Sequence, residues 1–506
     1  MPARKSPLRN GREPLRIVQE GILEAARGFG LDPIRTVFEL VAHDELNEIA
    51  AYGGFPTRYP HWRFGMGYEE LAKGYTYGLS KIYELVINND PCYAYLMKSN
   101  ALVDQKMVIA HVYGHSDFFK NNMWFSQTHR RMIDEMANHG TRIRRYLERH
   151  GEKTVEEFLD AALSLEWLID YHSVYSPTRR RTRYDFSEPE DPAAVRRFRA
   201  DHDYMDRYIN PPEYLEAQRK HNEDRARQAK RFPERPEKDV LAFLIEHAPI
   251  ENWQRDVLSI VREESYYIAP QALTKIMNEG WATYWHAKIM TEKALDPAEV
   301  VDFADHHSAT LGSQPGALNP YKLGVELWRD IEDRWNRGRF GREYDECDDL
   351  ARKRQWDLNL GLGREKIFEV RRIYNDLTFI DDFLTKEFCE DQNLFVYRHN
   401  AQSNRYEIGE RDFETVKRTL LFRLTNMGHP LLQVVDGNFR NRSELLLRHA
   451  HEGFDLDLEE ARDTLRNLQR IWQRPVNLET VVEDQLKLLT YDGQKHSEED
   501  LSAPAP

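Results

Sequence analysis

Residues 271–290 read QALTKIMNEGWATYWHAKIM, and this stretch sets our expectation for the architecture. Apolar and aromatic residues recur along it at helical spacing, and it follows Pro270, a residue type tolerated in the first turn of a helix. We predict a helix that begins near Pro270 and runs through Met290. Glu279 and His286, two side chains with metal-binding atoms, lie among its apolar neighbours.

Helical patterns continue on both sides of this stretch. DVLAFLIEHA (239–248) and NWQRDVLSIVREESYY (252–267) precede it, and VVDFADHHSATL (300–311) and KLGVELWRDIEDRW (322–335) follow it. Each segment carries an apolar face at helical period. We therefore predict that residues 239–388 form one helical part of the protein.

The front of the chain, residues 1–172, also reads as helices, and we expect it to pack against 239–388. Residues 44–70 are rich in Gly, Pro and aromatic side chains, which favours an ordered loop. From 173 to 238 charge and proline rise and the apolar period fades. This part is predicted to be an exposed insertion or long connection.

The pattern changes near residue 390. LFVYRH and RYEIG alternate around a polar loop. Short apolar segments follow, namely TLLFRL, LLQVV and SELLLRH, and Asp436-Gly437 signals a tight turn between two of them. One amphipathic helix, LEEARDTLRNLQRIW, precedes a strand-like segment, LETVVEDQLKLLTY. We predict a small α/β domain at 389–496 and a disordered tail at 497–506. The expected fold class is α+β and predominantly α-helical, with a large helical N-terminal region and a smaller mixed α/β C-terminal domain.

Composition limits the class of protein. The 506 residues are 41% apolar and 31% charged, which is typical of a folded globular chain, and the net charge of −14 disfavours a nucleic-acid partner. Three scattered cysteines predict neither a disulfide framework nor a cysteine zinc site. We find no run long enough to span a membrane and no secretory signal, so we expect a cytoplasmic protein.

The segment VIAHVYGHSDFFKNN (108–122) carries a pair of candidate metal ligands. His111 and His115 are four residues apart, so on a helix they share one face and can bind one ion. Zinc peptidases use this half-site in the H-E-x-x-H motif. Val112 stands where that motif has its catalytic Glu, so the usual general base is absent.

Glu279 is the candidate third ligand. In several helical zinc peptidases a Glu within an E-G-W-A string on a separate helix completes the site, and residues 279–282 have this sequence. His286 lies two turns further on, about 10 Å along the axis. It either supports the ligands from outside or joins Glu279 in a two-metal site. A hydrogen-bonded structural group without metal is the competing interpretation for the whole set.

Two other groups of residues are weaker candidates. Glu263 or Glu264 could be a displaced general base, with Glu264 preferred, although a solvated acidic patch is the commoner origin of such a pair. The adjacent His306 and His307 are typical of a surface. The sequence contains no phosphate-binding loop, no dinucleotide-binding glycine motif and no serine-hydrolase elbow.

The chain resembles the SpoVR family, named for the stage V sporulation protein R of spore-forming bacteria. The resemblance extends over nearly the whole length and is carried by AYGGFPTRYPHWRFG (51–65), YGLSKIYELVINNDPCYAYL (77–96), VIAHVYGHSDFFKNN (108–122), HRRMIDEMANH (129–139), the long string at 243–290, NPYKLGVELWRDIEDRW (319–335) and LTNMGHPLLQVVDGN (424–438).

The resemblance implies a role in formation of the spore cortex, or, in bacteria that do not sporulate, in a stationary-phase stress response. It also implies two partners, a PrkA-type serine kinase and a protein with a von Willebrand factor A-like domain. It supplies no catalytic residues.

Two hypotheses follow. In the first, His111, His115 and Glu279 hold a divalent metal, most simply zinc, in a hydrolase of peptide or amide bonds, and His286 or Glu264 orients or deprotonates the water. In the second, the protein is a non-enzymatic partner or scaffold in the kinase pathway, and the cluster is structural.

Overall fold

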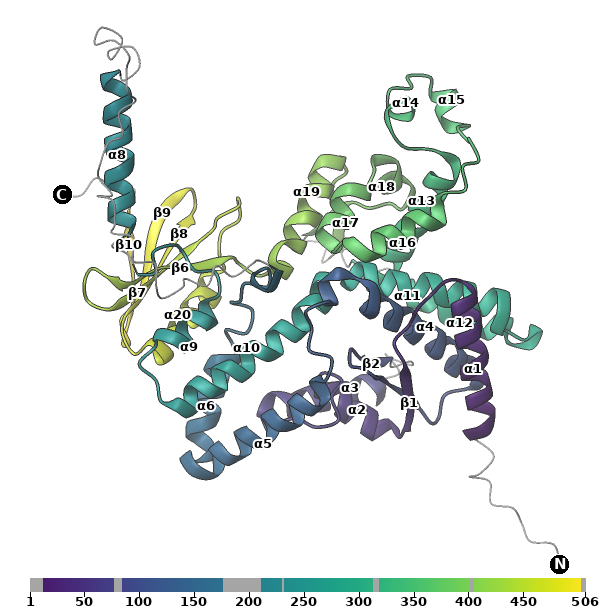
Figure 1. The fold of residues 1–506 in the computed structure, drawn as a ribbon, viewed down its shortest axis with the longest axis horizontal. Coiled ribbons are helices and arrows are strands. Elements are labelled where there is room, and N and C mark those ends of the chain that lie inside the picture. The colour runs from purple at the N-terminus through teal and green to yellow at the C-terminus, as the bar shows by residue number, and fades with distance from the viewer. Residues whose placement is uncertain are drawn as a thin grey trace, which may run out of the picture. The chain divides into compact units, whose positions relative to one another are not determined.

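The structure, a computed structural model, describes residues 12–76, 84–175, 211–229, 232–312, 318–400 and 405–501. The chain forms two compact units, each built from two separate stretches (Figure 1). The first unit comprises 1–145 and 267–428, and the second comprises 146–266 and 429–506. The predicted segments 1–172 and 239–388 therefore each contribute to both units. Helices dominate and the largest sheet lies near the C-terminus, which confirms the predicted α+β, mostly helical class.

The first unit begins with helices around a small sheet. Its elements are α1 (Arg12–Gly28), β1 (Thr36–Val41), α2 (His43–Ala51), α3 (Trp62–Thr76), β2 (Leu85–Ile87), β3 (Cys92–Met97), α4 (Leu102–Asn121) and most of α5 (Met132–His150). Strand β3 is central, parallel to β1 and antiparallel to β2.

The front of the chain differs from its prediction in two ways. The sheet was not expected, because its strands are short and β3 is an unbroken apolar run that sequence period cannot distinguish from a buried helix. Most of the loop expected at 44–70 is helical: α2 and α3 occupy it, and only residues 52–61 between them are irregular.

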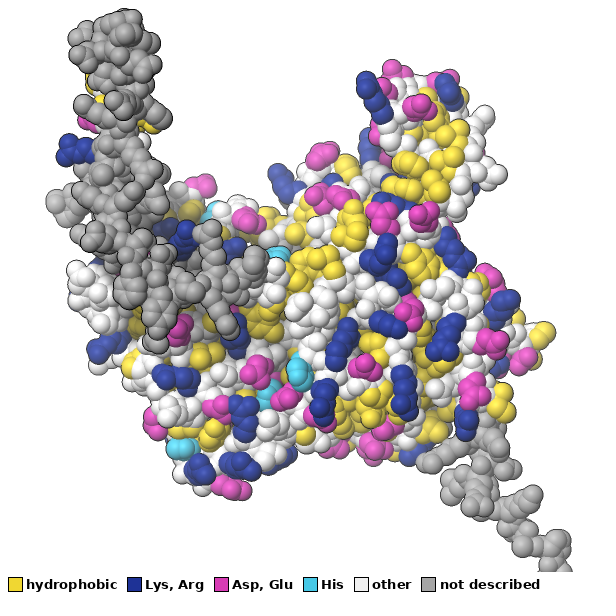
Figure 2. All heavy atoms as spheres, viewed as in Figure 1, with side chains coloured by type: hydrophobic (Ala, Val, Ile, Leu, Met, Phe, Trp, Pro, Cys, Tyr) yellow, Lys and Arg dark blue, Asp and Glu magenta, His cyan; other side chains and the backbone are white. Residues whose placement is uncertain are grey.

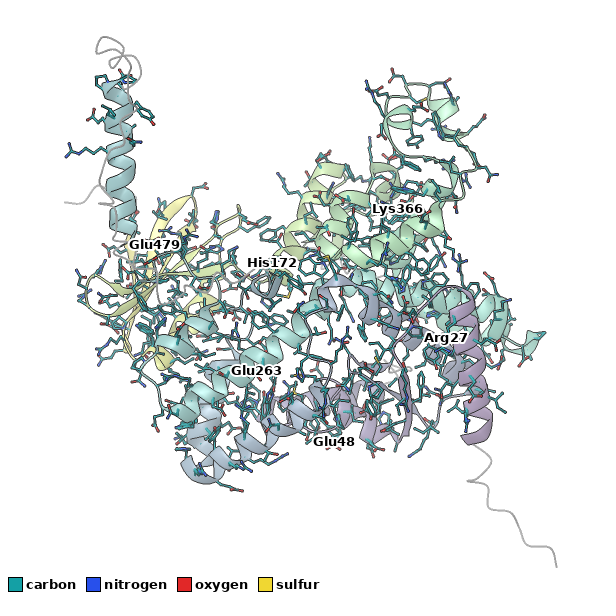
Figure 3. The ribbon with its side chains drawn as sticks, viewed as in Figure 1. Arg27, Glu48, His172, Glu263, Lys366 and Glu479 are labelled. Atoms are coloured by element: carbon teal, nitrogen blue, oxygen red, sulfur yellow. The ribbon has the colours of Figure 1, made fainter. Side chains whose placement is uncertain are left out.

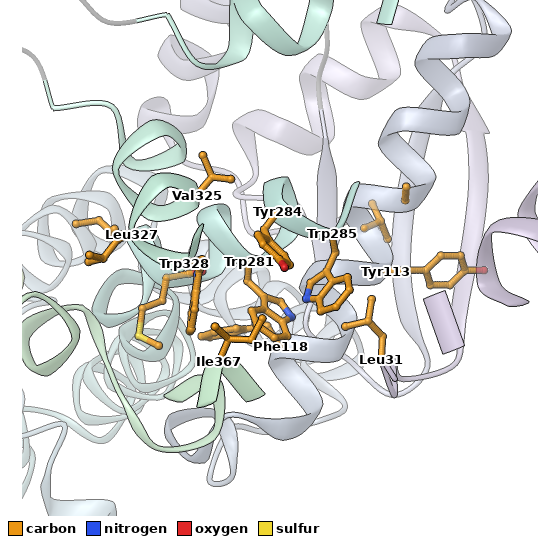
Figure 4. Close-up of a cluster of buried hydrophobic side chains, with 14 of the residues drawn as sticks. Leu31, Tyr113, Phe118, Trp281, Tyr284, Trp285, Val325, Leu327, Trp328 and Ile367 are labelled. Atoms are coloured by element: carbon orange, nitrogen blue, oxygen red, sulfur yellow. The ribbon is translucent and has the colours of Figure 1, made fainter. Parts of the chain in front are cut away.

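Helices α4, α11 (Lys275–Ile289) and α13 (Pro320–Arg337) form the centre of the first unit. Helix α4 is buried almost throughout, from Val103 to Phe119. On α11, the indoles of Trp281 and Trp285 pack edge to face, and Trp281 also packs against Trp328 of α13 (Figure 4). These rings are essentially inaccessible to water, so the helix that carries Glu279 sits in a stiff aromatic core.

Small residues bring these three helices into close contact. A Cβ added to Gly114 of α4 would lie 2.6 Å from the Cα of Ala282 on α11. A Cβ on Gly280 would lie 2.4 Å from the carbonyl carbon of Gly324 on α13. Neither distance is physically accessible, so backbone-to-backbone packing at these glycines fixes how near α4 and α13 come to α11.

The start of α11 differs from the prediction. Helix α10 (Asn252–Leu273) continues through Pro270, and the break falls at Thr274, whose φ of −128° and ψ of 22° are not helical. Asp376 caps the new helix by accepting hydrogen bonds from the backbone N–H groups of Ile276 and Met277, at 2.7 and 2.9 Å. The cap comes from 100 residues away in the sequence, which is why local patterns did not mark this boundary.

Asp376 should make stability depend on pH. Burial raises the pKa of its carboxyl to about 7, although the two backbone N–H groups act in the opposite direction. Because the pKa of Asp376 is higher in the folded state, its carboxyl group contributes fully to the free energy of unfolding below the unfolded-state pKa near 3.8. This contribution is lost as the pH rises through about 7. We compare the free energy of unfolding of the wild type with that of Asp376→Asn. The difference, wild type minus variant, should fall by at most about 4 kcal/mol between pH 4 and 7. Denaturant unfolding at several pH values measures this difference, and a rise with pH would contradict it.

The remaining elements of the first unit surround this centre. They are residues 267–273 at the end of α10, α12 (Val300–Thr310), α14 (Arg342–Asp345), α15 (Leu350–Arg354), α16 (Gly363–Ile373), α17 (Asp376–Phe383), α18 (Lys386–Asp391), α19 (Phe413–Leu424) and the hairpin of β4 (Val396–Asn400) and β5 (Arg405–Glu410). Exposed apolar side chains gather on the segment that carries α14 and α15 (Figure 2), among them Leu358 and Leu360.

The second unit combines helices with the larger sheet. Its helices are the end of α5, α6 (Glu152–Leu163), α8 (Pro212–Ala229), α9 (Val240–His247), most of α10 and α20 (Leu458–Trp472). Its sheet has the order β10-β9-β8-β7-β6 and consists of β6 (Leu432–Phe439), β7 (Glu444–His449), β8 (Val476–Val482), β9 (Gln485–Tyr491) and β10 (His496–Asp500). Neighbouring strands are antiparallel except β7 and β8, which α20 connects in parallel.

Three details of the C-terminal prediction were wrong. Asp436-Gly437 lies inside β6 at a shift of register, and the β6–β7 turn comes later. TLLFRL belongs to helix α19. Residues 497–500, expected in the tail, form β10, because they pair with β9 and Lys487 binds Glu498 at 2.6 Å.

Parts of two predicted segments lie outside the described residues. Of the connection at 173–238, residues 176–210 and 230–231 do so, while 212–229 form α8. Of the tail, residues 502–506 do so. Among the residues that are described, no helix has the length and apolar character needed to cross a membrane.

Candidate metal centre

Helix α4 places two imidazoles side by side in the first unit. His111 and His115 lie one turn apart with ring centroids 4.5 Å from each other, and both side chains are almost fully buried. The helix is continuous from Leu102 to Asn121, so the two histidines share one face, as expected from their spacing. Val112, at the position of the missing catalytic Glu, is buried in the apolar core.

Helix α11 brings Glu279 to these rings. Its Oε2 lies 3.3 Å from Nε2 of His115 and 3.5 Å from Nε2 of His111. The approach depends on the close packing of Gly114 against Ala282, one residue from His115 and three from Glu279. The sequence therefore named three residues that the structure brings together across 164 positions of chain.

A fourth side chain, Glu84, was missed. It directly precedes β2, and its Oε2 lies 3.2 Å from Nε2 of His111. One donor atom from each of the four residues lies within 4.8 Å of every other. Glu84 belongs to the family-like string 77–96, but no spacing links it to the histidines, and only the fold reveals its place.

Hydrogen bonds behind the rings hold the two imidazoles. Nδ1–H of His115 donates to Oδ1 of Asn278 at 2.9 Å, which leaves its Nε2 lone pair facing Glu279. Nδ1 of His111 lies 2.8 Å from Nδ1 of His286, and Nε2 of His286 lies 3.0 Å from Nδ1 of His307. Since both nitrogens of His286 are occupied in this way, the geometry favours the interpretation in which it supports His111 from behind.

The charges in the cluster are closely balanced. Nζ of Lys275 lies 2.5 Å from Oε1 of Glu279. Burial disfavours the charged form of Glu279, but His115, His111 and Lys275 outweigh it and hold the carboxyl pKa well below its usual value. Burial and the neighbouring imidazoles lower the pKa of His286, so this ring is neutral.

The donor atoms fit a tetrahedral metal ion. Nε2 of His111 and Oε2 of Glu279 are buried and make no hydrogen bond, although Oε2 of Glu84 lies 3.2 Å from the first atom and Nε2 of His115 lies 3.3 Å from the second. Ligands 2.0–2.1 Å from a zinc ion stand about 3.3–3.4 Å apart in a tetrahedron. The separations of 3.3 and 3.5 Å between Oε2 of Glu279 and the two imidazole nitrogens are close to that edge. A bound cation would satisfy these two buried atoms, which belong to a group of four donor atoms within 4.8 Å of one another.

A pocket of about 220 Å³ opens beside the cluster. Glu84, His111, His286 and Tyr321 form its polar wall, and Met107, Val108 and Thr310 line the rest. His115 and Glu279 lie outside this lining. The cluster is thus approached from the side of Glu84 and His111.

The other predicted residues do not belong to the group of four donor residues. Glu264 is buried on α10, in the part of that helix that belongs to the second unit. It is not one of the four converging residues. Its neighbour Glu263 is exposed (Figure 3). The predicted surface pair is half-buried: His307 contacts His286, and His306 lies 2.5 Å from Asp104 of α4.

Asn278 should tune any metal bound here. Asn278→Ala removes the acceptor that fixes the tautomer of His115, and changes of this kind cost about 10–100-fold in metal affinity. Asn278→Asp keeps an acceptor at the same place and should bind metal at least as tightly as the wild type. Competition titration of zinc against a chromogenic chelator checks both. Equal affinities for Asn278→Ala and wild type would contradict the assigned contact.

Two family models together match nearly the whole chain. The family model described as SpoVR like protein matches residues 11–429, and the model described as SpoVR-like C-terminal domain matches residues 430–483. The first match ends where the second stretch of the second unit begins. An Escherichia coli (strain K12) protein, "Uncharacterized protein YcgB", is 29% identical over 483 residues, which cover 91% of this chain and 90% of that protein. No solved structure matches. The chain belongs to the SpoVR-like protein family.

Proposed function

We propose that the protein is a metal-dependent hydrolase whose divalent cation, most simply zinc, is held by His111, His115 and Glu279. The observation that carries this proposal is the convergence of buried donor atoms, two of which make no hydrogen bond, at the separations of a tetrahedral ligand set.

The donor set supports a catalytic centre. Two imidazoles and one carboxylate are the protein ligands of many catalytic zinc sites, which keep a fourth position for water or substrate. A zinc ion so bound lowers the pKa of its water toward about 7 and polarises a carbonyl group. The fourth position would face the pocket, because His111 and Glu84 form the pocket wall.

The protein residues would supply the rest. His286 and Asn278 hold the two imidazoles in the tautomer that exposes Nε2 to the cation. Lys275 fixes Glu279 as a carboxylate. The partly apolar pocket admits one short group of a substrate, and we propose peptide or amide bonds as the substrate class.

The experiment is a cleavage screen. Protein stripped with a chelator and reloaded with one equivalent of zinc is incubated with a defined mixture of peptides, and new termini are found by mass spectrometry. We expect cleavage by the reloaded wild type and none by the stripped protein or by His115→Ala. Cleavage that is independent of zinc, or equal in His115→Ala, would refute the proposal.

A second candidate is a non-enzymatic partner or scaffold in a PrkA-type kinase pathway. One observation favours it: the cluster also balances without a cation. Burial opposes protonation of His111, but Glu84 and Glu279 raise its pKa to about 9, so a charged imidazole can offset the carboxylates. Metal-free protein after untagged purification, with cluster variants that only unfold more easily, would favour this candidate.

The cellular setting is also part of the proposal. We propose a role in spore-cortex formation or a stationary-phase stress response, in the cytoplasm, with the serine kinase and the von Willebrand factor A-like protein as partners. The family membership supports this setting. If the three proteins do not co-purify from native cells, this proposed setting is refuted.

A further inference from the structure

We propose that Glu84 is the proton acceptor of the metal centre and that Tyr321 positions it. This inference rests on the proposed function, because it assigns the base that the H-E-x-x-H comparison leaves vacant. Val112 cannot take that role, since it is an apolar residue packed in the core.

The two carboxylates of the cluster are not equivalent. Glu279 has 7% of its side chain exposed, extends from the middle of a buried helix and is tied to Lys275. Glu84 has 21% of its side chain exposed and lines the pocket, whereas Glu279 does not. Water and substrate reach the centre through the pocket, so Glu84 is the carboxylate that meets them first.

The two oxygens of Glu84 have different neighbours. Oε1 accepts a hydrogen bond from the hydroxyl of Tyr321 at 2.9 Å, and Oε2 faces Nε2 of His111 at 3.2 Å. The hydroxyl of Tyr321 is the donor in this pair, because a carboxylate oxygen can only accept. One oxygen is therefore anchored while the other points toward the coordination centre, which is the geometry of a positioned base.

The proposed step is balanced for hydrolysis of an amide. A water molecule at the fourth position gives a proton to Oε2 of Glu84, and its oxygen forms a bond to the carbonyl carbon. Glu84 then returns the proton to the amide nitrogen as the C–N bond breaks. Glu84 ends as a carboxylate, and the products are a carboxylic acid and an amine.

Cobalt(II) and acetohydroxamic acid are the probes for this role. Cobalt reports binding through its visible absorption, and the hydroxamate binds a metal as an anion after giving its proton to a base at the site.

We expect Glu84→Gln to bind one equivalent of cobalt with an affinity within about tenfold of the wild type, because a ligand set of three remains. Its affinity for the hydroxamate should fall about 10²-fold, the lower range for a general base. Tyr321→Phe should leave cobalt affinity unchanged and weaken hydroxamate binding about tenfold, because it removes one hydrogen bond to a charged group.

A matched pair provides the control. Tyr284 of α11 donates to Glu332 of α13 at 2.5 Å, a second tyrosine–carboxylate bond in the same unit. Tyr284→Phe and Glu332→Gln should leave both affinities unchanged. Thermal melts monitored by circular dichroism identify any variant that has lost its fold, and Glu84→Asp, which keeps a carboxylate, should recover part of the hydroxamate affinity.

The outcomes separate this assignment from the proposed function. Wild type that binds no cobalt would remove the metal centre and the proposed function with it. Normal cobalt binding with unchanged hydroxamate affinity in Glu84→Gln would overturn only the role of Glu84. A loss of more than tenfold in the cobalt affinity of Glu84→Gln would show Glu84 to be a fourth ligand, and it would overturn this assignment in favour of a closed site.

Discussion

His115→Ala should bind zinc at least about 10³-fold more weakly than the wild type. Changing a residue that hydrogen-bonds to a ligand lowers metal affinity about 10–100-fold, and removing a ligand itself must lower it further. The ring is almost fully buried, and its Nε2 faces Glu279 at 3.3 Å, so its removal takes one imidazole nitrogen from the centre of the cluster. Glu279→Gln should show a loss of the same order, since it replaces the carboxylate shared by both imidazoles. Competition titrations against chelators of graded affinity measure both changes.

The control for this prediction is His129→Ala. His129 is exposed and is not one of the four converging residues, so its loss should not alter zinc affinity. An equal decrease in all three variants would place the bound metal elsewhere. Unchanged affinity in His115→Ala, in protein shown by circular dichroism to be folded, would contradict the ligand assignment.

Gly324→Ala should destabilise the first unit by about 3 kcal/mol or more, near the upper end for overpacked cores. The added Cβ would lie 2.1 Å from the carbonyl oxygen of Ile276 and 2.7 Å from the Cα of Gly280, and both are backbone atoms of α11 that no side-chain rotation can move away. Helices α11 and α13 must separate, and Glu279 moves with α11. We therefore expect weakened metal binding together with the lower stability, measured by denaturant unfolding and zinc titration of the same sample.

Gly65→Ala is the matched control. Gly65 lies in helix α3, and a Cβ there would meet nothing within 4 Å. Alanine is the better helix former, so this variant should be about 0.5–1 kcal/mol more stable than the wild type, with unchanged zinc affinity. Equal stability of Gly324→Ala and the wild type would mean that α11 and α13 are not held at the distance described here.

The sequence predicts those parts of the site that depend on residues close together in the chain. His111 and His115 share a helical turn, and Glu279 stands in a recognisable string, so their types and spacing could be read directly. That α4 and α11 meet depends on Gly114, and the approach of α13 to α11 depends on Gly280 and Gly324. The partners of all three glycines are distant in the chain. A glycine within a helical pattern does not reveal what approaches it.

The missed features share this non-local origin. Glu84 reaches the cluster from the start of a three-residue strand, and His307 from a helix that reads as surface. The break before α11 depends on a cap from Asp376, and the first sheet depends on the pairing of β1 with β3 across 56 positions. Amphipathic helices such as α20 were predicted well, because their apolar period alone determines which face is buried.

X-ray absorption spectroscopy at the zinc edge identifies the ligands themselves, in untagged protein loaded with one equivalent of zinc. We expect nitrogen and oxygen ligands at about 2.0–2.1 Å, with the outer scattering of two imidazoles in the wild type and of one in any zinc retained by His115→Ala. Sulfur ligands at about 2.3 Å, or a first shell without imidazole, would show that His111, His115 and Glu279 do not hold the metal.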